Sequence, residues 1–269
     1  MSANLESKDY AYHIRELLGR GMYEDAKKIL AAGLLHFPVD PHLVQIAEEI
    51  PHKLYSSEFF DGQRLITSSS ASIILSILFE YFSPTSAIDI GAGSGVWSQS
   101  LLDLGVNEVT AVDGPWATHL SMMQGINFVP ANFNDEFPKT GAHNLAICVE
   151  VAEHFKPSRS EKFIEYIANS SDVVLFAAAL PRQLGEGHIN CRNHSFWARI
   201  FETHSYVPLD IFRSRVWCNS SVLPWYRQNC FLYVKKNLVG FFRGAPLASH
   251  MDVYHPLLVN QLVLLDHNK

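Results

Sequence analysis

The sequence predicts an α/β fold: a doubly wound, mostly parallel β-sheet with helices on both faces, which ends in an antiparallel pair of strands. Apolar segments of strand length alternate with amphipathic segments between residues 87 and 204, and this alternation is typical of successive strand–helix units. A glycine-rich turn follows the first of these strands. Beyond residue 205, two more strand-like segments are joined by a turn-rich stretch, which favours antiparallel pairing.

Each element is expected from a local pattern. Ser68 to Ser70 can cap a helix over residues 71–82, which Ser83-Pro84 ends. Residues 51–67 are expected to be irregular because they contain Pro51 and Gly62. Further helices are predicted at residues 96–104, 161–169 and 195–204. Strands are predicted at residues 87–90, 108–112, 127–129, 144–149, 172–179, 210–217 and 229–235.

The first 58 residues are expected to form a helical appendage ahead of the sheet. Apolar and small residues recur there at helical spacing, and the stretch resembles one tetratricopeptide repeat. The residues that carry this resemblance are Tyr10, Gly21, Tyr23, Ala26, Leu30, Gly33 and Pro38. A single repeat cannot bury both of its faces, so we expect either a partner-binding or homodimerising appendage or an ordinary helical hairpin that caps the main domain. The predicted domains are residues 1–58, residues 59–237 and a C-terminal extension, residues 238–269.

Composition excludes several classes of protein. The chain has 269 residues, 48% of them apolar, so it can bury a core and is not disordered throughout. The 21 Lys and Arg against 27 Asp and Glu give a net charge of −6, which argues against nucleic acid as a partner. The polar N-terminus does not resemble a signal peptide, and no apolar run approaches the ~20 residues that span a membrane. The sequence thus predicts a soluble, cytoplasmic protein with no membrane partner.

The glycine-rich turn is the most informative segment. It reads Asp89-Ile90-Gly91-Ala92-Gly93-Ser94-Gly95 and lies between a predicted strand and a predicted helix. Glycines let a ligand approach the backbone closely, and the first amides of the helix can donate hydrogen bonds to it. The dinucleotide fingerprint GxGxxG is incomplete because Val96 takes the place of its third glycine. An acid two residues before the first glycine would repel a phosphate and attract an ammonium group.

This DxGxGxG pattern resembles the first motif of class I S-adenosylmethionine (SAM) methyltransferases, whose cofactor carries an ammonium group. The resemblance implies a Rossmann-like fold over about residues 60–235, with SAM as cofactor and S-adenosylhomocysteine as product. In that family an acid at the end of the second strand binds both ribose hydroxyls, and Asp113 stands there; Asn132 stands where relatives carry an acid that faces the adenine. The cofactor-binding residues that the resemblance implies are Asp89, Gly91, Ala92, Gly93, Gly95, Trp97, Asp113, Gly114, Asn132, Phe133 and Glu150.

The fourth predicted strand ends in an E-x-x-E-H segment, Glu150 to His154, which resembles one branch of the same superfamily. Three interpretations stay open. In the first, which we favour, Glu150 shapes the pocket and His154 is a general base, because a neutral imidazole has a suitable pKa. In the second, Glu150, Glu153, His154 and His188 bind a divalent metal ion, which lowers the pKa of an acceptor hydroxyl. In the third, Glu153 and His154 cap the following helix.

The loop after the fifth strand carries a further candidate. Its pattern Q-x-G-x-G-H-x-N runs from Gln183 to Asn190 and resembles, more loosely, methyltransferases from glycan and natural-product gene clusters. His188 in this loop is expected either as an acid or base on the acceptor side or as a structural histidine. The predicted catalytic residues are His154, His188 and Glu150.

These resemblances imply a SAM-dependent methyltransferase that transfers a methyl group to a hydroxyl of a small molecule or glycan. The reaction would be an SN2 transfer that depends on alignment, with His or Glu assisting as base. The alternative is a methyltransferase-fold protein without activity that recruits a partner through its N-terminal helices. A nicotinamide-dependent oxidoreductase is a third hypothesis, and the incomplete GxGxxG argues against it.

Overall fold

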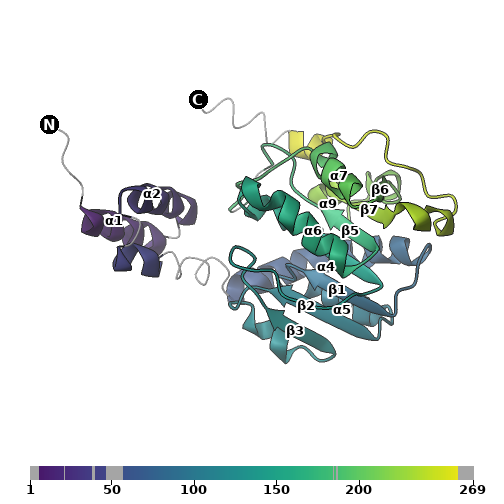
Figure 1. The fold of residues 1–269 in the computed structure, drawn as a ribbon, viewed down its shortest axis with the longest axis horizontal. Helices are drawn as coiled ribbons and strands as arrows, with labels where there is room; N and C mark the ends of the chain where they lie inside the picture. The colour runs from purple at the N-terminus through teal and green to yellow at the C-terminus, as the bar shows by residue number, and fades with distance from the viewer. Residues whose placement is uncertain are drawn as a thin grey trace. The chain divides into compact units, whose positions relative to one another are not determined.

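The computed structural model of the chain describes residues 6–20, 22–37, 40–46, 57–183, 185 and 187–259. The chain divides into two compact units, Met1–Phe60 and Asp61–Lys269, and Figure 1 shows both. In the first unit, α1 (Ser7–Gly19) and α2 (Tyr23–His36) pack on each other, and residues 41–46 are also helical. The Tyr10 ring approaches Gly33 so closely that a Cβ there would lie 3.1 Å from it. Gly21 and Pro38, two positions that carry the repeat resemblance, lie outside the described residues.

The second unit is built on a seven-stranded sheet with the order β3-β2-β1-β4-β5-β7-β6 (Figure 1). The five parallel strands are β1 (Ser86–Ile90), β2 (Glu108–Asp113), β3 (Ile126–Pro130), β4 (Leu145–Val149) and β5 (Val173–Ala177). β7 (Phe231–Lys235) runs antiparallel to β5 and to β6 (Tyr206–Leu209). The predicted α/β class, with a mostly parallel sheet and an antiparallel strand pair at its C-terminal end, is therefore confirmed.

Helices cover both faces of the sheet. Successive strand residues point to opposite faces, so alternate residues of one strand contact the two different helical layers. Leu145 and Ile147 lie in one core layer with α4 (Ser57–Phe79) and α5 (Val96–Asp103). Ala146 and Cys148 lie in the other layer with α6 (Ser160–Ser170) and α7 (His194–Thr203). With both faces buried, the central strands are continuously apolar, as the runs LAICV and VVLFA are.

Short helices complete the second unit. The α-helices are α8 (Arg213–Val216) and α9 (Pro224–Asn229). The 3-10 helices are η1 (Thr118–Met122), η2 (Ala152–His154), η3 (Pro157–Arg159) and η4 (Lys236–Phe241). No helix within the described ranges has the length and apolar character needed to cross a membrane.

Two predictions of local structure are wrong. The strand predicted at residues 210–217 is instead a bend followed by α8, and the Asp210 carboxylate accepts the backbone N–H of Arg213 (3.3 Å) within this bend. The strand itself lies earlier, at β6, and contains Pro208, which cannot donate a ladder hydrogen bond and is tolerated at a sheet edge. The helix predicted at residues 71–82 begins at Ser57 and ends at Phe79, so residues 57–67 are helical rather than irregular.

The residues after η4 return to the edge of the sheet. The Asp210 N–H donates to the Pro246 carbonyl (2.9 Å), and the Ala248 N–H donates to the Pro208 carbonyl (3.0 Å). These bonds satisfy backbone groups on the outer side of β6, which would stay unpaired if this edge strand were uncovered. The described part of the predicted C-terminal extension thus packs on the second unit.

The strand order identifies the edge where a ligand would bind. From β1 the chain continues outward through β2 and β3, and it then returns to β4 on the other side of β1. Such a reversal is a topological switch point, and ligands of open α/β sheets bind there, beyond the carboxyl ends of the strands. The glycine turn after β1, Asp113 at the end of β2 and Glu150 after β4 all lie at this end of the sheet.

Candidate active site

The glycine turn is shaped by backbone conformation and by close packing. Gly91 and Gly95 have φ values of +77° and +74°, in the left-handed region that favours glycine. A Cβ on Gly91 would lie 2.5 Å from the Val151 side chain, and one on Gly95 would lie 2.6 Å from the Met123 sulfur. Any side chain at either position would therefore force the turn away from the segments that follow β4 and β2.

Two side chains hold the carbonyls of the turn. The Arg64 guanidinium, on α4, donates to the Ser94 carbonyl (3.1 Å). The His119 Nε2 atom lies 3.0 Å from the Gly93 carbonyl, and because a carbonyl can only accept, this nitrogen carries the proton. Sequence reasoning did not single out either residue, since each comes from an element outside the motif.

The two aspartates at this edge differ in their surroundings. Asp89 is buried and accepts a hydrogen bond from the Ser98 hydroxyl (2.7 Å). Burial raises the pKa of Asp89 to about 7, opposed by the Ser98 hydrogen bond and reinforced by the charge of Asp113. Asp113 is partly exposed, and its carboxylate accepts the backbone N–H groups of Gly93 (2.7 Å) and Gly114 (2.6 Å). Desolvation by the surrounding protein raises the pKa of Asp113. Those two hydrogen bonds, together with one from the Trp116 side chain, oppose the rise.

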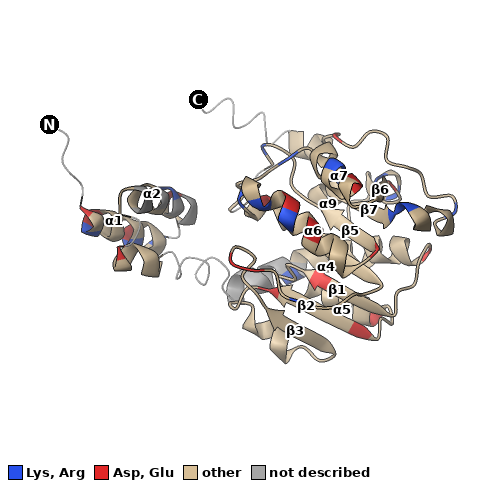
Figure 2. Cartoon of the chain, viewed as in Figure 1, with Lys and Arg blue, Asp and Glu red and all other residues tan. Residues whose placement is uncertain are grey.

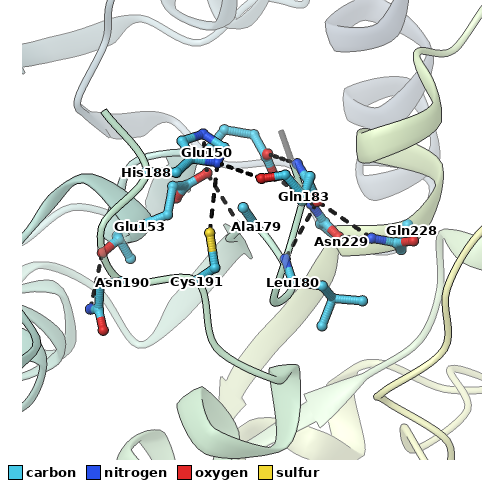
Figure 3. A network of polar contacts seen from close by, with 11 residues as sticks. Glu150, Glu153, Ala179, Leu180, Gln183, His188, Asn190, Cys191, Gln228 and Asn229 are labelled. Carbon is cyan, nitrogen blue, oxygen red and sulfur yellow. Dashed lines mark hydrogen bonds and ion pairs between the residues drawn. The ribbon is translucent and has the colours of Figure 1, made fainter. Parts of the chain in front are cut away.

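Glu150 follows β4 in an unusual backbone conformation. Its φ is +57°, a region that non-glycine residues enter at a cost and mostly at functional sites. Its backbone N–H donates to the Ala177 carbonyl of β5 (2.9 Å). Its two carboxylate oxygens accept the side-chain amides of Asn229 (2.8 Å) and Gln183 (2.9 Å) (Figure 3). Burial raises the pKa of Glu150, and these amide donors oppose the rise.

Glu153, His154 and His188 form a cluster beside Glu150. One potential ligand atom from each lies within 4.8 Å of the others, and the two imidazole rings are 5.0 Å apart. The His188 Nδ1 faces the Gln183 carbonyl at 3.1 Å, so it carries a proton, and Nε2 faces a Glu153 oxygen at 3.9 Å (Figure 3). Burial, followed by the charge of Glu150, raises the pKa of Glu153 well above its ordinary value.

The loop that carries His188 is fastened to η2. The backbone N–H groups of Ile189 and Asn190 each donate to the Glu153 carbonyl at 2.9 Å. The buried Asn190 amide also donates to the Ser160 hydroxyl (3.0 Å). The third interpretation is that Glu153 and His154 cap the next helix and satisfy backbone groups. Its capping part is wrong, because η3 and α6 begin without a side-chain cap, whereas Glu153 Oε1 does accept a backbone N–H, that of Ala179 (3.3 Å).

The structure brings together three of the four residues considered as metal ligands. Glu153, His154 and His188 converge, whereas the Glu150 carboxylate is held by Asn229 and Gln183. Two histidines and one carboxylate are a donor set that binds divalent metals such as zinc or iron, so the converging residues fit a metal ion without Glu150. The proton on His188 Nδ1 leaves Nε2 as the ligating nitrogen, the arrangement usual for histidine ligands.

Behind Glu150 lies a polar chain of which sequence reasoning named only Gln183. The Asn229 amide donates to Glu150 and to the Gln183 side-chain oxygen (3.0 Å). The Asn229 oxygen accepts the Gln228 amide (2.8 Å) and lies 3.1 Å from His194 Nε2. All of these residues except Glu150 come from α7, α9 or the loop after β5, which are 33 or more residues away along the chain. The loop pattern indicated Gln183, and the signal for the other two residues was the polar pair Gln228-Asn229 before an apolar strand.

Of the remaining predicted residues, Trp97, Phe133 and Ala92 are buried, whereas Asn132 is partly exposed. Trp97 packs in the core against the Tyr226 ring, with centroids 5.5 Å apart, and Phe133 is buried among aromatic side chains of the opposite layer. The Asn132 side-chain oxygen accepts the backbone N–H of Asn134 (3.1 Å). Ala92 is buried within the glycine turn. The buried positions therefore offer a ligand their backbone more readily than their side chains.

Four carboxyl groups gather at this end of the sheet. Asp89, Asp113, Glu150 and Glu153 lie there, and within the part of the chain that the structure describes none of them pairs with a Lys or Arg side chain. Strands β1 to β5 contain no Lys or Arg, and Figure 2 shows positive residues on outer helices such as α6 and α7. The site therefore favours a cationic ligand over a phosphate.

Known structures share this architecture. No protein-family model matches the chain, and no curated protein matches it. Human N-acetylserotonin methyltransferase in complex with SAM is 14% identical and superposes with a TM-score of 0.50 over 75% of this chain and 61% of that chain. A candidate O-methyltransferase from Nostoc punctiforme PCC 73102 is 11% identical and superposes with a TM-score of 0.51 over 66% of this chain and 59% of that chain. The chain thus spans about three fifths of each of these two structures, and it has the fold of SAM-dependent methyltransferases.

Proposed function

We propose that this chain is a SAM-dependent methyltransferase. The observation that carries the proposal is the group of four carboxyls at the switch point, which meets no Lys or Arg among the described residues. Burial raises the pKa values of Asp89, Glu150 and Glu153, and a ligand that brings positive charge stabilises their ionised forms. SAM carries a sulfonium and an ammonium group, whereas a nicotinamide dinucleotide carries a pyrophosphate. The charge of the site therefore favours SAM.

The residues at the strand ends fit different parts of SAM. Asp113 presents a partly exposed carboxylate beside the glycine turn, and carboxylates accept hydrogen bonds from a ribose diol. Asp89 is hydrogen-bonded to Ser98 inside the protein, so its proposed effect on the ammonium group is electrostatic. Asn132 and the backbone of Phe133 are proposed to face the adenine. When bound, SAM supplies an electrophilic methyl group that an aligned nucleophile displaces.

We propose a hydroxyl of a small molecule or glycan as the methyl acceptor. His154 and His188 lie beside Glu150, with ring centroids 5.0 Å apart. A neutral imidazole there accepts the hydroxyl proton as the oxygen attacks, which makes the oxygen a stronger nucleophile. The two structures named above include one candidate O-methyltransferase and one methyltransferase named for the small molecule N-acetylserotonin. Both are in keeping with a small acceptor.

A metal ion is the second way to activate such a hydroxyl. Glu153, His154 and His188 would hold it, and a divalent ion there would orient the acceptor and lower its pKa. If the ion is required, a chelator should abolish methyl transfer, and Mg²⁺, Mn²⁺ or Zn²⁺ should restore it. If a histidine acts alone, transfer should survive the chelator while His154→Ala or His188→Ala lowers the rate.

Calorimetric titration with S-adenosylhomocysteine, with NADH as a matched control, tests the cofactor. We expect S-adenosylhomocysteine to bind and NADH to give no heat of binding. Binding of NADH alone would overturn the proposal. The alternative, a methyltransferase-fold protein without activity, would bind the cofactor but transfer no methyl group. Protein that binds S-adenosylhomocysteine is therefore next incubated with methyl-labelled SAM and pools of hydroxylated small molecules and glycans. If the labelled methyl group stays on SAM with every pool, the result would favour the protein without activity.

A further inference from the structure

The orientation of the Asn229 amide is fixed by a backbone group of the predicted C-terminal extension. The His255 N–H donates to Gln228 Oε1 (2.6 Å), and because a backbone N–H can only donate, the Gln228 atom that faces it is the oxygen. The other end of the same amide, Gln228 Nε2, donates to the Asn229 side chain (2.8 Å), so the atom that accepts this bond is Oδ1. Asn229 Nδ2 therefore faces Glu150, at 2.8 Å (Figure 3).

His194, the first residue of α7, lies between two oxygens that can only accept. Its Nδ1 is 3.0 Å from the Met251 carbonyl, and its Nε2 is 3.1 Å from Asn229 Oδ1. Each nitrogen needs a proton to make its bond, so the ring makes both bonds only as an imidazolium. A neutral ring would turn a lone pair towards one of the oxygens, and His194 is only 2% exposed, so the lost bond is costly.

His255 shows the contrast within the same region. It is also buried, but its Nε2 lies 2.8 Å from the Trp217 carbonyl, whereas its Nδ1 accepts the backbone N–H of Leu257 (3.3 Å). One proton on the His255 ring therefore satisfies both nitrogens. The ring of His194 needs two.

We propose that His194 is a positioning residue: as an imidazolium it holds the Asn229 amide in the orientation that presents an N–H to Glu150. The role of His194 in the site rests on the proposed function, whereas its protonation does not. Asn229 accepts from His194 with its oxygen and donates to the Glu150 carboxylate with its nitrogen. His194 thus acts through Asn229 and not on a reacting atom.

Charged groups on two elements face His194. Arg213 of α8 also donates to the Met251 carbonyl (3.2 Å), and Asp252 follows Met251 in the chain. Burial lowers the pKa of His194 and the Arg213 charge adds to this, whereas the bonds to the two oxygens and the charge of Asp252 oppose the fall. Because the pKa lies below its ordinary value, the imidazolium forms in mildly acidic solution and loses a proton as the pH rises.

Imidazole N–H resonances in an NMR spectrum count the protons on each ring. We expect His194 to give two at about pH 5 and one at about pH 8, and His255 to give one at both. The resonances missing from His194→Gln and from His255→Gln assign the two rings. If His194→Gln does not fold, cross-peaks to the Phe231 ring, whose centroid lies 5.2 Å from that of His194, assign the wild type. A single N–H from His194 at both pH values would overturn the imidazolium.

Two amide substitutions separate the two bonds of His194. The side-chain nitrogen of His194→Gln can take the place of Nε2 and keep the bond to Asn229, whereas that of His194→Asn can take the place of Nδ1 and keep the bond to Met251. Both variants lose the charge, and in both Arg213 still serves the Met251 carbonyl, so they differ at Asn229. We expect His194→Asn to bind S-adenosylhomocysteine roughly three- to tenfold more weakly than His194→Gln, the effect of losing one hydrogen bond.

The same pair of substitutions at His255 is the matched control, because its ring bonds to Trp217 and Leu257 and not to Asn229. His255→Gln and His255→Asn should bind S-adenosylhomocysteine equally. If the two His194 variants bind equally, or the His255 pair differs by as much, the positioning role is wrong and the proposed function stands. If the wild type does not bind S-adenosylhomocysteine, the proposed function and the positioning role both fail, and the N–H resonances still decide the charge of His194.

Discussion

Glu150 shows at the scale of one residue how the fold supports the site. Its left-handed backbone, with φ of +57°, costs about 1–3 kcal/mol in a non-glycine residue. The conformation is maintained because the backbone bonds to Ala177 and the side chain bonds to Asn229 and Gln183. The result is a carboxylate fixed at the switch point, beside Glu153 and the two histidines.

Asp89 gives a prediction for pH dependence. Its pKa is about 7 in the folded protein and 3.8 without the fold, so the folded state binds more protons between these values. The free energy of unfolding should therefore fall as the pH rises from about 4 to 7. Asp89→Asn, which keeps an oxygen for Ser98 but cannot ionise, should be more stable than the wild type above pH 7 by on the order of 1–4 kcal/mol.

Denaturant unfolding at pH 5 and at pH 8 measures this effect. The stability difference between Asp89→Asn and the wild type should be larger at pH 8. Asp103→Asn, an exposed acid at the end of α5, controls for removal of a negative charge. A difference that is the same at both pH values would contradict the raised pKa.

Individual residues differed in how far the sequence could predict them. Asp89, Gly91 and Asp113 were predictable because each lies at a strand end within a short motif. Asn229 was not, because its role depends on contacts that a motif does not contain. Asn229 reaches Glu150 only because β7 pairs with β5.

At the scale of elements, α8 ties the C-terminal segment to the sheet. The buried Arg213 forms an ion pair with Asp210 (2.6 Å), donates to the carbonyls of His250 and Met251, and lies 4.5 Å above the centre of the Phe231 ring. Arg215, two residues later, forms an ion pair with Glu80 at 2.7 Å, and both side chains are substantially exposed.

This contrast predicts unequal effects of the same substitution. Arg213→Ala should lower the free energy of unfolding by about 3–5 kcal/mol, because it leaves Asp210 and two carbonyls without their partner. Arg215→Ala should cost under about 1 kcal/mol, because exposed ion pairs contribute little. Urea unfolding of both variants tests this, and equal losses would contradict the roles assigned to the two arginines.

Helices and strands could be predicted from the sequence only where the local hydrophobic pattern agreed with the final tertiary structure. The parallel strands followed from continuous apolar runs, which burial on both faces requires. Residues 210–217 read as a strand because Ile211, Phe212 and Val216 are apolar, yet they form a bend and a helical turn in which Asp210 binds the backbone and the guanidinium of Arg213. The start of α4 was missed because Gly62 within a helix is a weak signal that tertiary structure overrides.

The whole molecule combines a net charge of −6 with a site whose described residues place no Lys or Arg beside its carboxyls. SAM carries one more positive charge than S-adenosylhomocysteine, so its binding should depend more on ionic strength. Between about 50 mM and 500 mM salt, the Kd for SAM should rise roughly two- to fivefold more than that for S-adenosylhomocysteine, because salt screens the attraction. Calorimetry at three salt concentrations measures both slopes, and equal slopes would show that the carboxyls do not act on the sulfonium.

The sequence predicted the α/β class of the molecule better than the chemistry of its site. Strand alternation and one glycine turn suffice for the class, because both are local. The grouping of Glu153, His154 and His188 needed the loop after β5 to fold back onto η2, where Asn190 donates to the carbonyls of Ala152 and Glu153, and spacing along the chain does not encode this.

The central claim is that the switch point binds SAM through Asp113. The most direct test is calorimetric titration of Asp113→Asn with S-adenosylhomocysteine, beside the wild type and Asp135→Asn, a neighbouring exposed acid. Asparagine replaces one acceptor oxygen with a donor, which cannot accept a ribose hydroxyl. We predict that Asp113→Asn weakens binding by about tenfold or more, whereas Asp135→Asn binds as the wild type does. Equal affinity in all three proteins would contradict the claim.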